Sequence, residues 1–271
     1  MSSENQSPKD SAKVVSLQKG ALLHLTLNNG PANVLSIEVM AQLKTAIEEA
    51  AQNDSIRVII IGHAGKVFSA GHDLKEMTDR RADADGGQAF FSQTFETCAE
   101  LMMAITKCPK PVIAVINGLA TAAGCQLVAT CDLAMSTDKA TFCTPGVNIG
   151  LFCSTPMVAV SRAAHRKQAM EMLLTGETID AGTAKEFGLI NRIVPEDYLD
   201  QVVTKYAEVI ASKSPLVVKI GKEAFYKQAE MSMQDAYDYT ARVMTENMLA
   251  GDACEGIGAF MEKREAKWSG N

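Results

Sequence analysis

The chain has 271 residues, of which 47% are hydrophobic and 21% charged, which predicts a globular protein with one large domain or a domain with an appendage. Its net charge of −6 argues against nucleic acid or an anionic membrane surface as the main partner, although a few lysines could still bind an anionic small molecule. The longest apolar runs fall well short of the roughly 20 residues that a membrane span requires.

The polar opening "MSSENQSPKDSA" predicts a disordered lead over residues 1–12. It has neither the apolar stretch of a signal peptide nor the arginine-rich pattern of a mitochondrial presequence. We therefore expect a cytoplasmic protein, with a processed mitochondrial matrix protein as the alternative.

Cysteine and histidine usage argues against disulfides and metal sites. The seven cysteines are odd in number, scattered through apolar segments and free of any C-x-x-C pair, which predicts reduced, buried thiols. The four histidines are too widely spread for the usual spacings of a metal-ligand cluster, so we predict no metal.

The first half of the chain alternates predicted strands and helices. "VVSLQKGALLHLTL" (14–27) predicts two strands around a turn at Lys19 and Gly20. Ser36 predicts the N-cap of a helix, and "IRVIIIG" (56–62) is the β-branched run expected of a strand buried on both faces. Further along we predict a helix over about 90–105, followed by strands in "PVIAVINGLA", "DLAMST" and "ATFCTP".

Beyond about residue 145 nearly every pattern is helical. In the segment from Met233 to about Leu249, the residues Tyr237, Ala241, Met244 and Met248 fall on one helical face. A helical C-terminal third added to an α/β core often serves association. The alternative, that such faces only pack on the chain's own core, is equally compatible with the periodicity.

One candidate functional segment is "NGLATAAGCQLVATCD" (117–132), where a buried strand turns through small residues into a helix. The unpaired N–H groups of the first helical turn point at whatever occupies the turn, and the lack of bulk at Ala122, Ala123 and Gly124 lets a ligand oxygen approach closely. Such a site suits a carbonyl that becomes an oxyanion. The alternative is that the small residues only allow tight packing of helix on strand.

A second turn of this kind occurs in "KVFSAGHDLKEM" (66–77), with Ala70 and Gly71 at its apex. Asp73 predicts the N-cap of a helix, and the backbone of His72 can supply another N–H group. The alternative is an ordinary turn with a capping acid.

Together the two segments closely resemble the signature regions of the enoyl-CoA hydratase/isomerase (crotonase) family, and the likeness runs from about Val14 to the C-terminal "EGIGAFMEKREAKW". The resemblance implies an α/β fold, the crotonase (ClpP-like) spiral of β-β-α units, over 13–195. It also implies a helical C-terminal region over 196–271 for oligomerisation and pocket closure, in a homotrimer or a dimer of trimers. The implied ligand is an acyl-CoA thioester, with coenzyme A present only as part of the substrate and no metal or redox cofactor.

The resemblance also implies roles for individual residues. The backbone N–H groups of His72 and Ala123 correspond to the two that hold the thioester oxygen in the family. The substrate-binding positions are Ala70, Gly124, the phosphate-binding lysines Lys66, Lys75 and Lys263, the neighbouring Phe260, and Cys153 with Ser154 in "GLFCST" beside the acyl pocket. For the lysines the alternative is a solvated surface side chain, and for Cys153 and Ser154 it is a loop that caps a helix beginning near Pro156.

The sequence departs from the family at two positions. Family hydratases carry two glutamates that position a water and exchange protons with it, and here these positions are Gln126 and Gly146. An amide cannot accept a proton from water at neutral pH, and glycine has no side chain. Standard hydration, and isomerisation that relies on the second acid, are therefore doubtful. This arrangement most resembles a divergent, hydratase-like group of the family in which "SAGHDLKE" and "GLFCST" also occur.

Three functional hypotheses follow. The first is an acyl-CoA lyase or isomerase of this family, or a decarboxylase or thioesterase, in which the His72 side chain is the best candidate to replace the missing acids, ahead of Cys125 and Cys153. The second is a non-catalytic acyl-CoA-binding or regulatory protein. The third, a serine or cysteine hydrolase, is weak because no histidine–acid pair has a clear place beside Cys125 or Ser69.

Overall fold

The structure is a computed structural model that describes residues 12–271, so the predicted lead lies almost entirely outside the described residues. The strands form two sheets, a larger one with the strand order β1-β2-β3-β5-β7-β10 and a smaller one with the order β4-β6-β8-β9. The strands are β1 Val14–Lys19, β2 Leu22–Leu27, β3 Val58–His63, β4 Val67–Ser69, β5 Val112–Ile116, β6 Leu119–Thr121, β7 Leu133–Ser136, β8 Thr141–Cys143, β9 Ile179–Asp180 and β10 Arg192–Ile193. All described pairings are parallel except β1 with β2 and β8 with β9.

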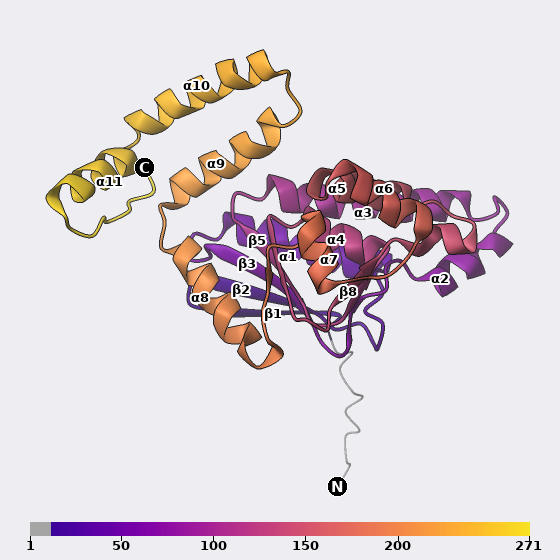
Figure 1. Ribbon diagram of the computed structural model, residues 1–271. Helices are drawn as coiled ribbons and strands as arrows, with labels where there is room; N and C mark the ends of the chain where they lie inside the picture. Colours follow the sequence, from indigo (N-terminus) through magenta and orange to yellow (C-terminus); the bar gives the residue numbers. More distant parts are fainter. Residues whose placement is uncertain (1–11) are drawn as a thin grey trace, which may run out of the picture.

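Consecutive strands are divided between the two sheets. In each of the pairs β3 and β4, β5 and β6, and β7 and β8, the first strand joins the larger sheet, the second joins the smaller one, and helical segments follow. This repetition is the spiral of β-β-α units expected from the sequence (Figure 1). The prediction of one strand in "PVIAVINGLA" is wrong, because the chain changes sheet there. A β-carbon on Gly118 would lie 2.1 Å from Lys66 O, so glycine is required at the crossing.

The helices that follow these strands are α1 Ile37–Gln52, α2 Leu74–Asp79, α3 Gln88–Lys107, α4 Ala123–Thr130, α5 Ser154–Ala163, α6 Arg166–Thr175 and α7 Ala181–Phe187, with 3₁₀ turns η1 Arg80–Ala82, η2 Pro145–Ile149 and η3 Glu196–Tyr198. The predicted N-caps at Ser36 and Asp73 are confirmed, since each side chain accepts backbone N–H groups of its helix. The break between α5 and α6 was not predicted. It arises where His165 N donates to Phe187 O at 3.1 Å.

Strand β3 of the larger sheet is buried on both faces, as its β-branched run predicts. Ile59 and Ile61 belong to the main core with α1, α3 and α4, whereas Val58 and Ile60 belong to a second core. Helix α8 (Leu199–Ala211) closes this second core with Leu199, Val203 and Ala207. The division of the chain at 195 and 196 remains a prediction, and α8 packs directly on the body of the molecule.

Three further helices, α9 Pro215–Gln228, α10 Met233–Leu249 and α11 Gly251–Glu262, extend away from this body (Figure 1). We call them, with the segment that follows to Asn271, the helical lobe. Ser214 caps α9 by accepting Val217 N–H. In the part of the chain that the structure describes, no residue of α10 is buried. Among residues 12–271, no helix is both long enough and apolar enough to cross a membrane.

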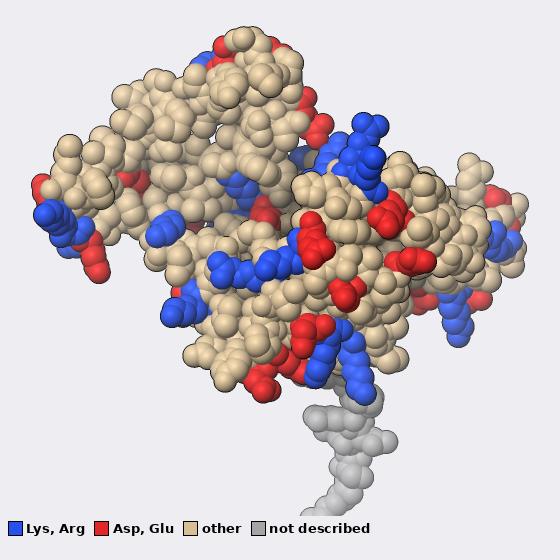
Figure 2. All heavy atoms as spheres, in the orientation of Figure 1, with Lys and Arg blue, Asp and Glu red and all other residues tan. Residues whose placement is uncertain are grey.

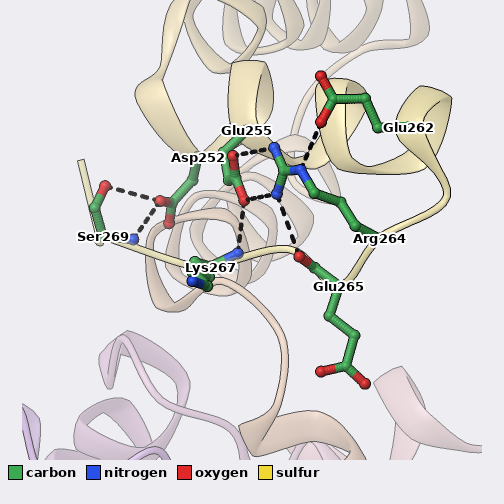
Figure 3. Close-up of polar contacts among 7 residues, drawn as sticks. All are labelled: Asp252, Glu255, Glu262, Arg264, Glu265, Lys267 and Ser269. Carbon is green, nitrogen blue, oxygen red and sulfur yellow. Dashed lines mark hydrogen bonds and ion pairs between the residues drawn. The ribbon is translucent and has the colours of Figure 1, made fainter.

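Polar contacts hold the lobe in two places, one against the body and one within the lobe itself. Lys222 of α9 donates to Asp132 Oδ2 at 2.6 Å, and Tyr226 donates to Asp132 Oδ1 at 2.8 Å. At the far end, Asp252 accepts hydrogen bonds from Ser214, Ser269 and Gly270, while Arg264 pairs with Glu255, which also accepts Lys267 N–H (Figure 3). We call this second group of contacts the C-terminal clasp. It ties the last residues to α11 and to the start of α9.

The expectation of buried, reduced thiols is confirmed for six of the seven cysteines, which are free and buried. Cys254 is a correction, because it is free but exposed. Cys254 lies on α11, in which only Asp252 and Ala259 are buried. The apolar residues around Cys254 in the sequence therefore do not form a core that covers it.

Candidate functional site

The two strand-exit turns identified in the sequence meet at one point of the molecule. A β-carbon on Gly71, which follows β4, would lie 3.0 Å from Ala122 Cβ and 3.1 Å from Ala123 N. Gly71 has a φ of 85° and Ala122 a φ of 50°, a left-handed conformation that is strained for alanine. The turn that carries His72 is therefore in direct contact with the start of α4.

The hydrogen bonding of these turns leaves several backbone N–H groups without an acceptor. The N–H groups of Ala70, Gly71 and Ala122 donate to Ala32 O, Ser69 Oγ and Cys143 O, at 2.9, 3.2 and 3.0 Å. By contrast, the N–H groups of His72 and Ala123 have no protein acceptor within residues 12–271. Ala123 is the first residue of α4, a position whose N–H has no partner inside the helix. The N–H groups of Gly124 and Cys125, in the first turn of α4, also have no acceptor in this part of the chain. The N–H groups of His72 and Ala123 are the two of this set to which the family resemblance assigns the thioester oxygen.

The His72 side chain is packed between two elements. Its Nδ1 lies 3.4 Å from Leu35 O, and its ring meets the Phe95 ring edge-on with 5.6 Å between centroids. Its Nε2 is fully buried and has no partner within residues 12–271. Burial lowers the pKa of His72, and the Leu35 carbonyl opposes this only in part. The imidazole is therefore neutral at pH 7, and a proton on Nδ1 would leave Nε2 able to accept one.

Gln126 lies in α4 beside this histidine site and is only 4% exposed. Cys98 Sγ donates to Gln126 Oε1 at 3.6 Å. Cys98 and Phe95 are about one turn apart on α3, so one face of α3 contacts both Gln126 and His72. The sequence did not predict this role for α3. The apolar periodicity of its predicted helix was the available signal, but it does not say what the buried face covers.

Gly146, the position of the second family glutamate, is enclosed by the chain that follows it. A β-carbon there would lie 2.8 Å from Leu151 O and 2.9 Å from Cys153 Sγ. Leu151 N also donates to Gly146 O at 2.9 Å. Cys153 precedes α5 but its thiol makes no capping hydrogen bond, and Ser154 is the exposed first residue of that helix. Gly146 is thus a site of close backbone packing as well as a lost acid.

The remaining predicted residues near the turns differ in burial and in hydrogen bonding. A β-carbon on Gly124 would lie 2.4 Å from Ser69 O, which supports the packing interpretation at this position. The Ala70 N–H is already used, as described above. Lys66 and Lys75 are both exposed, one before β4 and one in α2, so they flank the same short strand.

Phe260 and Lys263 are not brought to this site within one chain. Phe260 lies on α11 and is 84% exposed, and Lys263 ends that helix in a left-handed conformation. Figure 1 places α11 at the opposite end of the molecule from α2, which carries Lys75. Five cavities of about 290 to 620 Å³ lie elsewhere, and these five are not lined by His72, Ala123, Gln126 or Gly146.

The two nucleophiles considered for a hydrolase have no activating partner in the described chain. Ser69 Oγ accepts the Gly71 N–H at 3.2 Å. Cys125 is fully buried, and burial raises the pKa of its thiol well above the ordinary value. Neither side chain is hydrogen-bonded to a histidine within residues 12–271. The geometry gives this hypothesis no support.

The spiral architecture and the paired turns define a protein of the crotonase fold. The family model described as "Enoyl-CoA hydratase/isomerase" matches residues 18–271. The chain belongs to the enoyl-CoA hydratase/isomerase family.

Similar proteins include the divergent group that the sequence resembles. The chain is 46% identical over 253 residues to rat "Enoyl-CoA hydratase domain-containing protein 3, mitochondrial", covering 93% of this chain and 83% of the rat protein. The crystal structure of human enoyl-CoA hydratase domain-containing protein 3 aligns with a TM-score of 0.89 at 44% identity, over 95% of this chain and 100% of the other. A Mycobacterium smegmatis enoyl-CoA hydratase structure gives a TM-score of 0.89 at 42% identity, over 95% and 99% of the two chains.

Proposed function

We propose that the chain is an enzyme that binds an acyl-CoA thioester and polarises its carbonyl between the backbone N–H groups of His72 and Ala123. The observation that supports this is the contact of the two turns, each of which presents a backbone N–H group, of His72 or of Ala123, that is unpaired in the described chain. Family membership suggests the ligand class. One well-placed donor of this kind typically stabilises a developing oxyanion by about 3 to 4 kcal/mol.

The reaction we propose is a lyase or isomerase step that does not depend on the two family glutamates. Gln126 can position a polar group but cannot accept its proton, and Gly146 contributes only backbone. The unpartnered Nε2 of His72 is a candidate neutral base on the residue whose backbone N–H is one of the two proposed donors. A decarboxylase or thioesterase would use the same donors. A non-catalytic acyl-CoA-binding protein is the alternative of a different class.

The proposal can be tested by infrared spectroscopy of a bound, ¹³C-carbonyl-labelled saturated acyl-CoA. Two hydrogen bonds to the thioester oxygen lower the carbonyl stretching frequency relative to free ligand. We expect this red shift on binding to the full chain. Binding without a shift would contradict the oxyanion role, and it would favour the non-catalytic alternative.

Hydration of crotonyl-CoA tests the missing acids. The loss of a general base typically lowers a rate about 10²- to 10⁴-fold, so we expect weak hydration at most. Gln126→Glu is nearly isosteric and keeps an acceptor for Cys98, so it should raise the rate by about 10-fold or more. Gly146→Glu is unsuitable as a companion because of the contacts with Leu151 and Cys153. Fast hydration by the unaltered protein would show that another group supplies the base.

We further propose that the chain acts as a homotrimer or dimer of trimers in the mitochondrial matrix. The exposed apolar side chains of the helical lobe support assembly, and Phe260 and Lys263 would then serve the site of a neighbouring chain. The name of the rat relative, which places that protein in mitochondria, supports the mitochondrial alternative over the cytoplasmic location first expected. Sedimentation and imaging of the tagged full-length protein test the two statements separately.

A further inference from the structure

A cavity of about 540 Å³ lies where the helical lobe joins the body. The body lines it with residues from 51–57 and 109–111 and with the end of α8, and the lobe lines it with the first turns of α9 and with 269–271. Pro109, Pro111 and Pro215 are among the lining residues, and their fixed φ angles limit how far the walls can move. Sites for small molecules commonly have volumes of about 300 to 1,000 Å³, so the cavity has room for one.

The charged side chains that line this cavity are mostly basic. One of them, Asp54, is an acid, and the others are four cations from four separate segments of the chain: Arg57, Lys110, Lys213 and Lys219. The chain as a whole has a net charge of −6, so the excess of positive charge is local. Basic side chains are visible along the junction of the lobe and the body in Figure 2.

Only one of the four cations has protein partners. Lys110 Nζ donates to Ala50 O and Asn53 O at the end of α1. By contrast, the other three cations form no ion pair within residues 12–271: Arg57, Lys213 and Lys219. Cations around one partly enclosed space repel each other, and a bound anion relieves this repulsion.

The first turn of α9 adds a backbone donor to the cavity. Leu216 lines the cavity at the second position of α9, where an N–H group has no partner inside the helix. The capping residue Ser214 does not bond it, because its hydroxyl accepts Val217 N–H. The nearby acid, Asp252, is held by the C-terminal clasp and does not line the cavity. Asn271 does line it, but its oxygen accepts Asp252 N–H at 2.9 Å.

We propose that this cavity binds a small phosphorylated molecule at a site separate from the thioester site. Arg57 holds the phosphate from the body, Lys213 from the linker between α8 and α9, and Lys219 from the lobe. A guanidinium offers paired donors to phosphate oxygens, and an ammonium group acts as a compact point charge. Because the cations belong to both parts of the molecule, the bound anion links the lobe to the body.

The site is distinct from the turns that carry the proposed oxyanion donors. His72 and Ala123 do not line the cavity, and neither do Lys66 and Lys75, to which the family resemblance assigns the phosphates of CoA. The inference therefore goes beyond the proposed function, and it can be tested whether or not an acyl-CoA binds.

Titration calorimetry of the full chain with inorganic pyrophosphate at low ionic strength measures the binding. We expect saturable binding that Arg57→Gln weakens about 10-fold and Lys219→Gln about 3-fold, because each change removes one cation from the cavity. Lys205→Gln is the matched control, since it removes the same charge from an exposed position of α8 outside the cavity. It should weaken binding by less than about 2-fold.

Two results would overturn the proposal. One is a lack of pyrophosphate binding. The other is equal weakening by Lys205→Gln, which would show attraction to the general surface charge. Because Arg57 is half-buried, the melting temperature of Arg57→Gln without pyrophosphate checks its fold. If that variant is unfolded, the exposed Lys219 carries the same test through Lys219→Gln.

Competition decides whether the site is separate, because CoA also carries phosphates. Saturating butyryl-CoA should change the affinity for pyrophosphate by less than about 2-fold. Arg57→Gln should likewise leave the affinity for butyryl-CoA unchanged. Displacement of pyrophosphate by butyryl-CoA would overturn the separate site. A failure of butyryl-CoA to bind would contradict the proposed function alone, since the pyrophosphate titration does not depend on it.

Hydrogen exchange tests the link between the lobe and the body. Pyrophosphate should slow exchange over 263–271 and in the first turns of α9, because the anion holds these segments against the body. Exchange in the body strands should not change. Pyrophosphate binding without slower exchange in the lobe would overturn the linking role.

Discussion

The body and the helical lobe are stabilised in different ways. In the body, Ile59, Ile61 and Leu25 are completely buried, and the larger sheet has apolar cores on both faces. In the lobe, Met233 is 80% exposed and Leu249 is 79% exposed. On the face drawn in Figure 2, charged side chains are scattered over the body but are sparse along the lobe. The body buries its own apolar surface, whereas the lobe presents apolar surface outward.

This difference indicates how each part holds its position. Apolar burial of about 25 cal/mol per Å² stabilises the body without any partner. The lobe relies on two groups of polar contacts: the Lys222 site attaches it to the body, and the C-terminal clasp ties its last residues to α11 and to Ser214. A surface of this kind is suited to association with other chains. Substitutions at either group of contacts test this difference between the body and the lobe.

The largest effect should come from Lys222→Met. Lys222 and Asp132 are 7% and 16% exposed, so loss of the ammonium leaves a buried carboxylate without its cation. Removal of one partner from such a pair typically costs about 3 to 5 kcal/mol of unfolding free energy. Urea unfolding of the full chain measures this. Lys219→Met, on the exposed side of the same helix, is the control and should change stability by less than about 0.5 kcal/mol.

A smaller effect should follow from Asp252→Ala in the clasp. The change leaves Ser214, Ser269 and Gly270 without their shared acceptor, and hydrogen bonds to a charged group are each worth about 1.5 to 3 kcal/mol. Because the tail is exposed at Ser269 and water can replace part of the lost acceptor, we expect a total loss of about 2 kcal/mol, less than the sum of the separate bonds, together with faster hydrogen exchange over 263–271. Exchange in the body strands should not change. Equal acceleration in both regions would show that the lobe and the body unfold as one unit.

The clasp should also depend on pH. Hydrogen bonds from Arg264 lower the pKa of Glu255 from its usual 4.5 to about 2. Burial alone would raise the pKa of Asp252, but its hydrogen bonds outweigh this and lower it. Since folding lowers both pKa values, the stability they contribute is present above about pH 4.5 and is lost as the pH falls toward 2. Proteolysis with an acid-active protease should release the tail before it cleaves the body.

The smallest effect on stability should come from Leu249→Ser at the end of α10. Because Leu249 is almost fully exposed, the unfolding free energy of the chain under dilute conditions should change by less than about 0.5 kcal/mol. Sedimentation equilibrium should nevertheless show weaker self-association, since apolar surface is lost from the outward face. Gln234→Ser on the same helix is the matched polar control. Unchanged association in Leu249→Ser would exclude this part of α10 from the interface.

Local patterns in the sequence predicted most of the elements correctly. Strand and helix signals located β1 to β3, α1 and α10, and the caps at Ser36 and Asp73 were recognised as residues whose side chains bond nearby backbone N–H groups. The change of sheet at Gly118 was missed, because a run of apolar residues does not reveal which sheet each half joins.

Tertiary contacts within the site were harder to predict from the sequence. The two turns could be paired through the family resemblance, and the structure brings Gly71 against Ala123. The enclosure of Gly146 by Cys153 depends on a return of the chain that no local pattern encodes. The distance of Phe260 from the turns likewise follows from the direction of the lobe, which its helical periodicity does not specify.

The pair of Lys222 and Asp132 also has a consequence for the order of folding. The two residues are separated by 90 positions, and every strand of both sheets, together with α8, precedes Lys222 in the chain. During synthesis the body can therefore be complete before the lysine leaves the ribosome. Docking of α9 then becomes a late and separate step, and a chain halted before it would display an unfilled acidic site on an otherwise finished body.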